Sequence, residues 1–326
     1  MAVAIRARAK TPRASRWLVM LRWMLRGVGL LGCTAAIAMT PGLVSRTLHG
    51  GAPLMPTGVE TLLSYRALAL AGGAWLLVLA ELLPRLSEKR DPLLEPLGLL
   101  LPIGVLAVCG FLKVLYGPEN RVYTDLVGED GIVEYATSAF YFGAGWLAVL
   151  AARGLLRRDE RLLGVLWAGL AVALVIVSLE EISWGQRLFG VPTPALFEAN
   201  VQHEMNLHNL PPIQHSLHAA YIATGLYGSL AWALLGGVGS ARFRERVGWL
   251  VPRRWLFACF LPVALFYAVF DFTPSRWVDS HGLRFGFISK YDQEPAELLL
   301  SLGFLLFAAH ALARLHGRLG ASDKGR

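Results

Sequence analysis

Long runs of apolar residues without a charged side chain recur along the chain and alternate with short polar stretches. Such runs occupy residues 27–45, 96–112, 135–152 and 162–179. A membrane core of about 30 Å needs about 20 mostly apolar residues to be crossed by an α-helix. The pattern therefore predicts eight membrane-spanning helices, at about 27–45, 63–84, 95–115, 133–152, 162–184, 213–237, 255–273 and 295–315.

The composition agrees with this pattern and excludes an ordinary soluble fold. Hydrophobic residues make up 55% and charged residues only 17% of the 326 residues, and the mean hydropathy is +0.49. Soluble domains carry about 25% charged residues. We therefore expect an all-α, polytopic transmembrane helix bundle in which residues 1–326 form a single integral membrane domain.

The basic residues indicate how this bundle is oriented. Of the 31 Lys and Arg residues, 23 fall on one side of the predicted bundle and eight on the other, and a basic segment at 1–26 lies on the richer side. Basic residues concentrate in cytoplasmic loops, so both termini are predicted to be cytoplasmic. The basic residues of the predicted cytoplasmic loops also account for the net charge of +8, so this charge does not indicate a nucleic-acid-binding surface. We interpret the first apolar run as an uncleaved signal anchor; the alternative is a signal peptide cleaved near Ala36-Ile37-Ala38.

Acidic residues and histidines gather on the opposite, outer side. Fifteen of the 23 acidic residues and five of the eight histidines lie in outer loops or near the outer ends of predicted spans. The polar outer loops are predicted at about 117–132, 186–212 and 274–294. Any chemistry is therefore expected on the outer face.

The fifth predicted span ends in E-E-I-S-W-G-Q-R, residues 180–187. Glu180 and Glu181 follow eighteen uncharged residues, which places two carboxylates at membrane depth, where ionisable groups are costly and are candidates for function. If the helix continues, one face carries Glu180, Ser183, Trp184 and Arg187, and Glu181 points about 100° away. We interpret Glu180, Glu181 and Arg187 as candidate catalytic residues. The alternative is an interfacial anchor formed by Trp184 and Arg187.

The loop after this span is rich in side chains that donate, accept or ligate. His203-Glu204 with His208 is one residue longer than the zinc-protease spacing H-E-x-x-H, which places the two histidines about 140° apart on a helix and excludes that motif. An irregular loop can still bring both histidines to one metal, together with Asp271 of the seventh span. The alternative is a solvated polar loop. The candidate substrate-binding residues are Trp184, Gln186, Asn200, Gln202, Glu204, Asn206 and Asn209.

Three further spans bring carboxylates to the same level. Glu134 opens the fourth span and is a candidate catalytic base, Asp271 ends the seventh, and Glu294 and Glu297 open the eighth. Each of them alone is explained by a helix cap or a solvated helix end. Together they suggest one polar cavity that opens outward.

One part of the chain resembles a known family. The string E-E-I-S-W-G-Q-R, preceded by E-D-G-x-x-E at 129–134 and followed by N-x-Q-x-E-x-N-L-H-N at 200–209, resembles a family of uncharacterised bacterial polytopic inner-membrane proteins. The resemblance covers roughly the middle third of the chain and rests on Trp, Gln, Arg and His in the same order. It implies a location in the bacterial inner membrane and specifies no reaction.

These observations support one hypothesis and two rivals. We expect an integral membrane enzyme with an outward-facing site, a hydrolase or group transferase acting on a membrane lipid or lipid-linked substrate. A divalent metal such as zinc activates water in one version, and a carboxylate base with Arg187 as an anion clamp acts without metal in the other. The rivals are a transporter or channel for a polar solute or protons, and a non-catalytic membrane assembly factor.

Overall fold

In the computed structural model, all regular secondary structure of the described residues is helical. The described residues are 16–38, 73, 76–77, 80, 91, 93–116, 121–128, 130–198, 200, 204–208, 210–235, 238–272 and 293–317. The chain divides into two compact units, Met1–Ser87 and Glu88–Arg326. The prediction of an all-α fold is confirmed for this described part of the chain.

Among the residues that the structure describes, four helical stretches are long and apolar enough to cross a membrane. They are Leu94–Leu112, Arg121–Leu156, Arg161–Glu181 and Gln293–Leu315. These stretches correspond to the third, fourth, fifth and eighth predicted spans, and apolar helices of this length are typical of a membrane protein. The helices that contain them are α4 (Leu94–Tyr116), α5 (Arg121–Val127), α6 (Ile132–Leu156), α7 (Arg161–Glu181) and α13 (Gln293–Leu315).

Two further predicted spans are helical as well. The sixth corresponds to α9 (Pro211–Leu235) and the seventh to α11 (Phe257–Phe272). The connection between them contains the short helix α10 (Ala241–Val247) and the 3-10 turn η3 (Arg254–Leu256). Within the described residues, the apolar stretch Arg254–Ala268 is shorter than the four stretches above.

In the first unit, the first helix begins earlier than predicted. Its helix α1 (Arg16–Ala38) begins well before Gly27, so part of the basic segment 1–26 is helical rather than a separate tail. The second predicted span lies outside the described residues except for 73, 76–77 and 80, which are helical. A Cβ on Gly29 of α1 would lie 2.8 Å from the carbonyl oxygen of Gly73, so glycine permits this close approach of two backbones.

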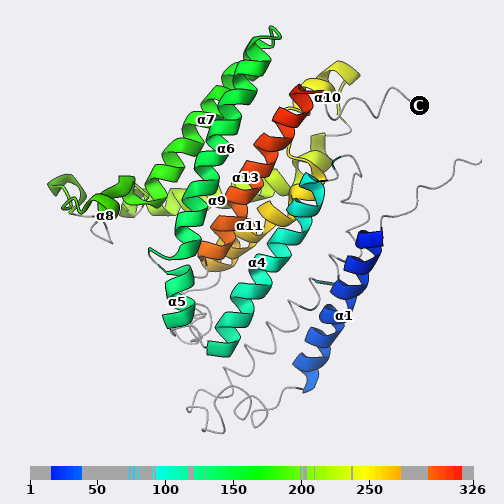
Figure 1. Ribbon diagram of the computed structural model, residues 1–326, viewed down its shortest axis with the longest axis vertical. Helices are drawn as coiled ribbons and strands as arrows, with labels where there is room; N and C mark the ends of the chain where they lie inside the picture. The colour runs from blue at the N-terminus through cyan, green and yellow to red at the C-terminus, as the bar shows by residue number, and fades with distance from the viewer. Residues whose placement is uncertain are drawn as a thin grey trace, which may run out of the picture. The chain divides into compact units, whose positions relative to one another are not determined.

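In the second unit, α13 is the central helix. It packs along α6, and α6 packs along α7, so these three helices run side by side (Figure 1). On its other sides α13 contacts α4 and α11, and α11 packs along α9. Trp167 of α7 is almost fully buried and stacks on Phe307 of α13 with ring centroids 5.1 Å apart. Aromatic pairs of this kind add to the packing energy of apolar burial.

A reciprocal pair of hydrogen bonds fixes the register of α6 against α7. The Ser138 hydroxyl donates to the carbonyl oxygen of Ser178, and the Ser178 hydroxyl donates to the carbonyl oxygen of Ser138, each at 2.8 Å. Both serines are buried, and buried hydroxyl groups must be paired in this way. Because each serine is about one turn from a carboxylate, this pair places Glu134 and Glu181 at the same end of the two helices.

Candidate functional site

Helix α7 ends at Glu181, and the backbone then makes a left-handed turn. Ser183, Trp184 and Gly185 have φ angles of 47°, 55° and 77°, before α8 (Gln186–Phe189) begins. The predicted continuous helical face through Glu180, Trp184 and Arg187 is therefore wrong. A non-glycine residue in this region costs of order 1–3 kcal/mol and persists only where its surroundings impose it.

Side-chain hydrogen bonds impose this turn. The Ser183 hydroxyl donates to Glu204 Oε2 at 2.5 Å, and Trp184 Nε1 donates to Glu180 Oε1 at 2.6 Å. Ser183 is fully buried, whereas Trp184 is partly exposed. The turn thus connects the end of α7 to the irregular segment at 204–208, which lies about 20 residues further along the chain.

Glu180 anchors that segment. Its Oε2 accepts the backbone N–H groups of Leu207 at 2.6 Å and His208 at 3.1 Å, and His208 Nδ1 lies 3.5 Å away. With Trp184 on the other oxygen, both carboxylate oxygens of Glu180 have protein donors. This arrangement brings together Glu180 and His208, two of the candidate site residues, and gives Glu180 the geometry of a residue that positions a loop.

Arg187 is surrounded by carboxylates. Its Nη1 lies 2.7 Å from Asp130 Oδ2, its Nη2 binds Glu204 Oε1, and Glu134 Oε1 lies 3.9 Å from Nη2. Burial lowers the pKa of the guanidinium, but the hydrogen bonds to Asp130 and Glu204 outweigh burial and raise that pKa above its ordinary value. Glu134 in turn accepts the backbone N–H of Asp130. Arg187 therefore stays cationic and ties the start of α6 to the loop after α7.

The predicted substrate-binding amides serve the same loop. Gln186 accepts the backbone N–H of Met205 at 2.5 Å and donates to Thr193 at 2.9 Å. Asn200 donates to the side chain and the carbonyl oxygen of Asn206, each at 2.8 Å. These contacts fold the loop on itself. The remaining candidates Gln202, His203 and Asn209, and the side chain of Asp271, lie outside the described residues.

Glu181 points into a different environment from Glu180. One carboxylate oxygen from each of Glu181, Glu294 and Glu297 lies within 4.8 Å of the others. The Tyr267 hydroxyl donates to Glu297, and Tyr221 also hydrogen-bonds this carboxylate. Glu181 is 9% exposed and Glu297 5% exposed. The ends of α7 and α13 thus form a carboxylate cluster, which we define as Glu181, Glu294 and Glu297.

A cavity of about 360 Å³ lies beside this cluster. Its polar end contains Glu180, Glu181 and His208. The remainder is lined mainly by apolar residues of α7, α9 and α13 such as Leu174, Leu217 and Leu300, and also by Tyr141, Tyr221 and Thr224. The exposed apolar lining residues include Ile176 of α7, Ile213 of α9, and Leu207 in the loop before α9. The cavity therefore leads from an apolar surface to buried carboxylates. The sequence did not indicate these apolar lining residues, because an isolated apolar side chain carries no signal of a cavity.

Comparison with known proteins gives no relative. No family model, no curated protein and no solved structure matches the chain. The functional argument therefore depends on the site itself.

Proposed function

We propose that the chain is an integral membrane enzyme of the bacterial inner membrane, a hydrolase or a group transferase, that acts on a lipid or lipid-linked substrate. The observation that carries this proposal is the cavity with apolar walls and a carboxylate end. Ligand cavities of about 300–1,000 Å³ are typically apolar with a few polar groups that orient the ligand. An acyl or prenyl chain fits the apolar walls, and the reacting polar group then lies at Glu181.

Access from the bilayer supports a lipid as substrate. Ile176 and Ile213 are exposed apolar residues on two different helices that both line the cavity. In a membrane, such residues face lipid chains rather than water. A lipid can thus enter sideways between α7 and α9 without leaving the hydrocarbon core of the membrane. A water-soluble substrate would first have to enter that hydrocarbon core.

The carboxylate cluster supplies the chemistry. Three carboxylates this close repel one another, so they share protons or bind a cation. A carboxylic acid and a carboxylate side by side act as general acid and base. A divalent cation bound by the same oxygens would instead activate water, and hard cations such as Mg²⁺ suit an all-oxygen donor set better than zinc does. In both versions Glu181 faces the substrate, whereas Arg187 and Glu180 hold the loop in place.

The cavity can be blocked without touching a polar group. Ala173 lines the cavity on α7, and Ala168 lies on the same helix, is also exposed and does not line it. The experiment compares the lipids of a strain lacking the protein with those of strains expressing wild type, Ala173→Phe, Ala168→Phe or Glu181→Gln. We expect one lipid class to accumulate in the deletion strain, and only wild type and Ala168→Phe to reverse the accumulation.

Two results would contradict the proposal. Lipid composition that is unchanged by the deletion would remove the lipid substrate. Normal function of Ala173→Phe would show that the cavity is not used. Proton or solute flux through purified protein in liposomes, abolished by Glu181→Gln, would favour a transporter instead.

A further inference from the structure

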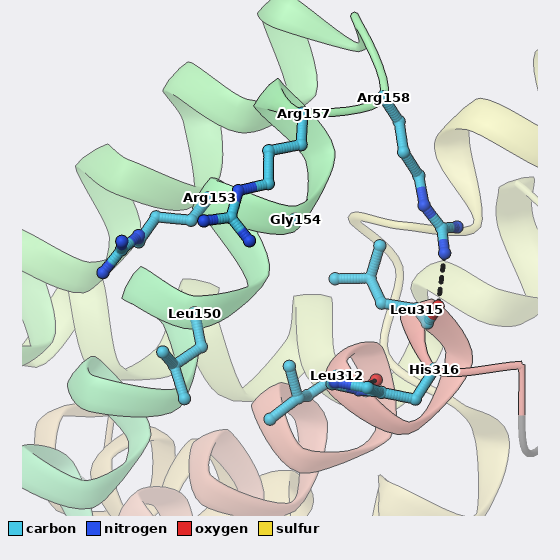
Figure 2. Close-up of a pocket in the computed structure, with 8 residues that line it drawn as sticks. All are labelled: Leu150, Arg153, Gly154, Arg157, Arg158, Leu312, Leu315 and His316. Carbon is cyan, nitrogen blue, oxygen red and sulfur yellow. Dashed lines mark hydrogen bonds between the residues drawn. The ribbon is translucent and has the colours of Figure 1, made fainter.

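A second cavity lies at the opposite end of α6 and α13. It has a volume of about 410 Å³ and is lined by Arg153, Arg157 and Arg158 of the α6 end, by His316 just beyond α13, and by apolar residues that include Leu150 and Leu312 (Figure 2). Glu134 and Arg153 are nineteen residues apart on α6, which corresponds to about 28 Å along the helix. This cavity is therefore separate from the carboxylate cluster.

Close helix packing shapes the cavity. A Cβ on Gly154 would lie 2.7 Å from Leu315 Cδ1, so the end of α13 rests directly on Gly154. The Arg158 guanidinium donates to the carbonyl oxygen of Leu315, and Figure 2 shows its side chain reaching down to this atom. In the same view the Arg157 side chain reaches back over Gly154. The cavity is thus part of the packed junction of two helices and not a loose surface feature.

Among the residues that the structure describes, no carboxylate offsets the positive charge of this cavity. Among the described residues, the side chains of Arg153 and Arg157 form no ion pair or hydrogen bond, and no carboxylate lines the cavity. The nearest acidic residues in the connection to α7 have other partners. Asp159 pairs with Arg161 at 3.0 Å, and Glu160 lies 3.6 Å from Arg246. The negative end of the α6 dipole offsets only about half a charge.

An apolar stripe leads to these arginines. Trp146, Leu150, Arg153 and Arg157 follow one another at intervals of three or four residues, so they share one face of α6. Trp146 is 60% exposed, and Leu150 is half-buried in the wall of the cavity. A ligand that is apolar along the helix and anionic at its end matches this face, because guanidinium groups bind phosphate oxygens bidentately.

We infer that this cavity binds the phosphate group of an anionic phospholipid, with an acyl chain lying along Trp146 and Leu150. Arg153 and Arg157 bind the phosphate oxygens, and Arg158 provides a third donor while it remains bonded to Leu315. Clusters of basic residues next to a membrane-spanning helix attract anionic lipids. The inference does not depend on the proposed enzymatic function, because it concerns the other end of the helices.

The test measures lipid binding to the purified full-length chain in detergent by native mass spectrometry. The ligands are phosphatidylglycerol, phosphatidylcholine and inorganic phosphate, each titrated separately. The variant is Arg153→Gln with Arg157→Gln, and the control is Arg161→Gln with Arg242→Gln, which removes the same charge from exposed positions outside the cavity. Thermal unfolding of all three proteins shows whether they are folded, and Arg153→Lys with Arg157→Lys retains charge without the planar guanidinium.

We expect wild type and control to bind one phosphatidylglycerol, the Gln variant to bind it about tenfold more weakly, and the Lys variant to fall between them. Weak binding of phosphatidylcholine supports recognition of net negative charge. Tight binding of inorganic phosphate, without a preference for phosphatidylglycerol, would overturn the lipid as the ligand and assign a soluble phosphate compound. Equal binding of phosphatidylglycerol by wild type, control and Gln variant would overturn the site.

Discussion

Glu180 and Glu181 are adjacent in the chain and serve two different parts of the structure. Glu180 accepts hydrogen bonds from Trp184, Leu207 and His208, whereas Glu181 lies with the carboxylates of α13. Successive residues of a helix differ by about 100° around its axis, so one residue faces the loop and the next faces the bundle. The pair therefore separates a positioning carboxylate from a candidate reacting one.

The first prediction concerns Glu180→Gln. Both oxygens of Glu180 accept hydrogen bonds, so a glutamine must turn its amide N–H₂ toward one of the donors. Leaving a buried donor without an acceptor costs about 1–3 kcal/mol. We expect the variant to unfold at a lower temperature than wild type in detergent, as followed by tryptophan fluorescence. The control Glu160→Gln alters a more exposed ion pair and should change the melting temperature little.

The second prediction is a coupling energy between Arg187 and Glu204. The two side chains are 25% and 10% exposed, whereas Arg161 and Asp159 form a comparable pair at 85% and 84% exposure. Screening by water makes exposed pairs worth about 1 kcal/mol or less. A double-mutant cycle of Gln and Asn substitutions should give a coupling of about 1–3 kcal/mol for Arg187–Glu204 and a smaller one for Arg161–Asp159. Equal couplings would show that the Arg187 network does not stabilise the loop.

The third prediction is a pH dependence. The pKa of Arg187 is raised by Asp130 and Glu204 against the effect of burial, so its contribution to stability is present below the unfolded pKa and is lost only as pH rises through the higher folded value. That value lies above the accessible range. The Arg187–Glu204 coupling should therefore be the same at pH 7 and pH 10. In Arg187→Lys the coupling should also persist at pH 10 and be lost only above the ordinary lysine pKa of about 10.4, because the same carboxylates favour the charged form of lysine.

The sequence was informative about the helices and less so about the site. Apolar runs without charge predict helices wherever they occur, and α4, α6, α7 and α13 occur where they were expected. The turn at Ser183 was missed because E-E-I-S-W continues a helical pattern, although Gly185 offered a signal for a helix end. The first helix starts earlier than expected because basic residues are compatible with helix outside the apolar run.

The carboxylate cluster could not be predicted in detail. Glu181 and Glu297 are brought together by the packing of α6 against both α7 and α13, and such contacts between distant segments leave no local pattern. Glu294 and Glu297 alone are explained by the helix dipole. Tyr221 and Tyr267 lie within apolar runs, where an aromatic residue indicates a core position. The sequence indicated a common site only because several predicted spans carry carboxylates at their outer ends.

The fourth prediction is topological. The connection at 157–160 and the segment at 186–198 flank α7, which is long and apolar enough to cross a membrane. The basic residues around Arg157 predict the cytoplasm for the first of them. A reporter fused after Asp159 should be active on the cytoplasmic side, and a reporter fused after Thr193 on the outer side. If both fusions reported the same side, α7 would not span the membrane, and the proposed site could not be assigned to the outer face.

The last prediction separates the two versions of the chemistry. If a cation binds the carboxylate cluster, purified protein should contain a divalent ion in near-stoichiometric amount, measurable by elemental analysis. Glu181→Gln and Glu297→Gln should each lose the ion, because removing one ligand of a small set greatly weakens binding. His208→Gln should retain it, since His208 lies at Glu180 rather than in the cluster. Loss of the ion from His208→Gln would instead support the histidine ligands expected from the sequence.

A metal-free site gives a different set of results. Wild-type protein would contain no stoichiometric ion, a chelator would leave activity intact, and Glu181→Gln would still abolish it, because an amide cannot take up or release the proton. Glu297→Gln should then reduce activity less than Glu181→Gln does, since Glu297 is bound by Tyr267 and acts on Glu181 through repulsion. Equal losses of activity in Glu297→Gln and Glu181→Gln would show that the two carboxylates do not have these separate roles.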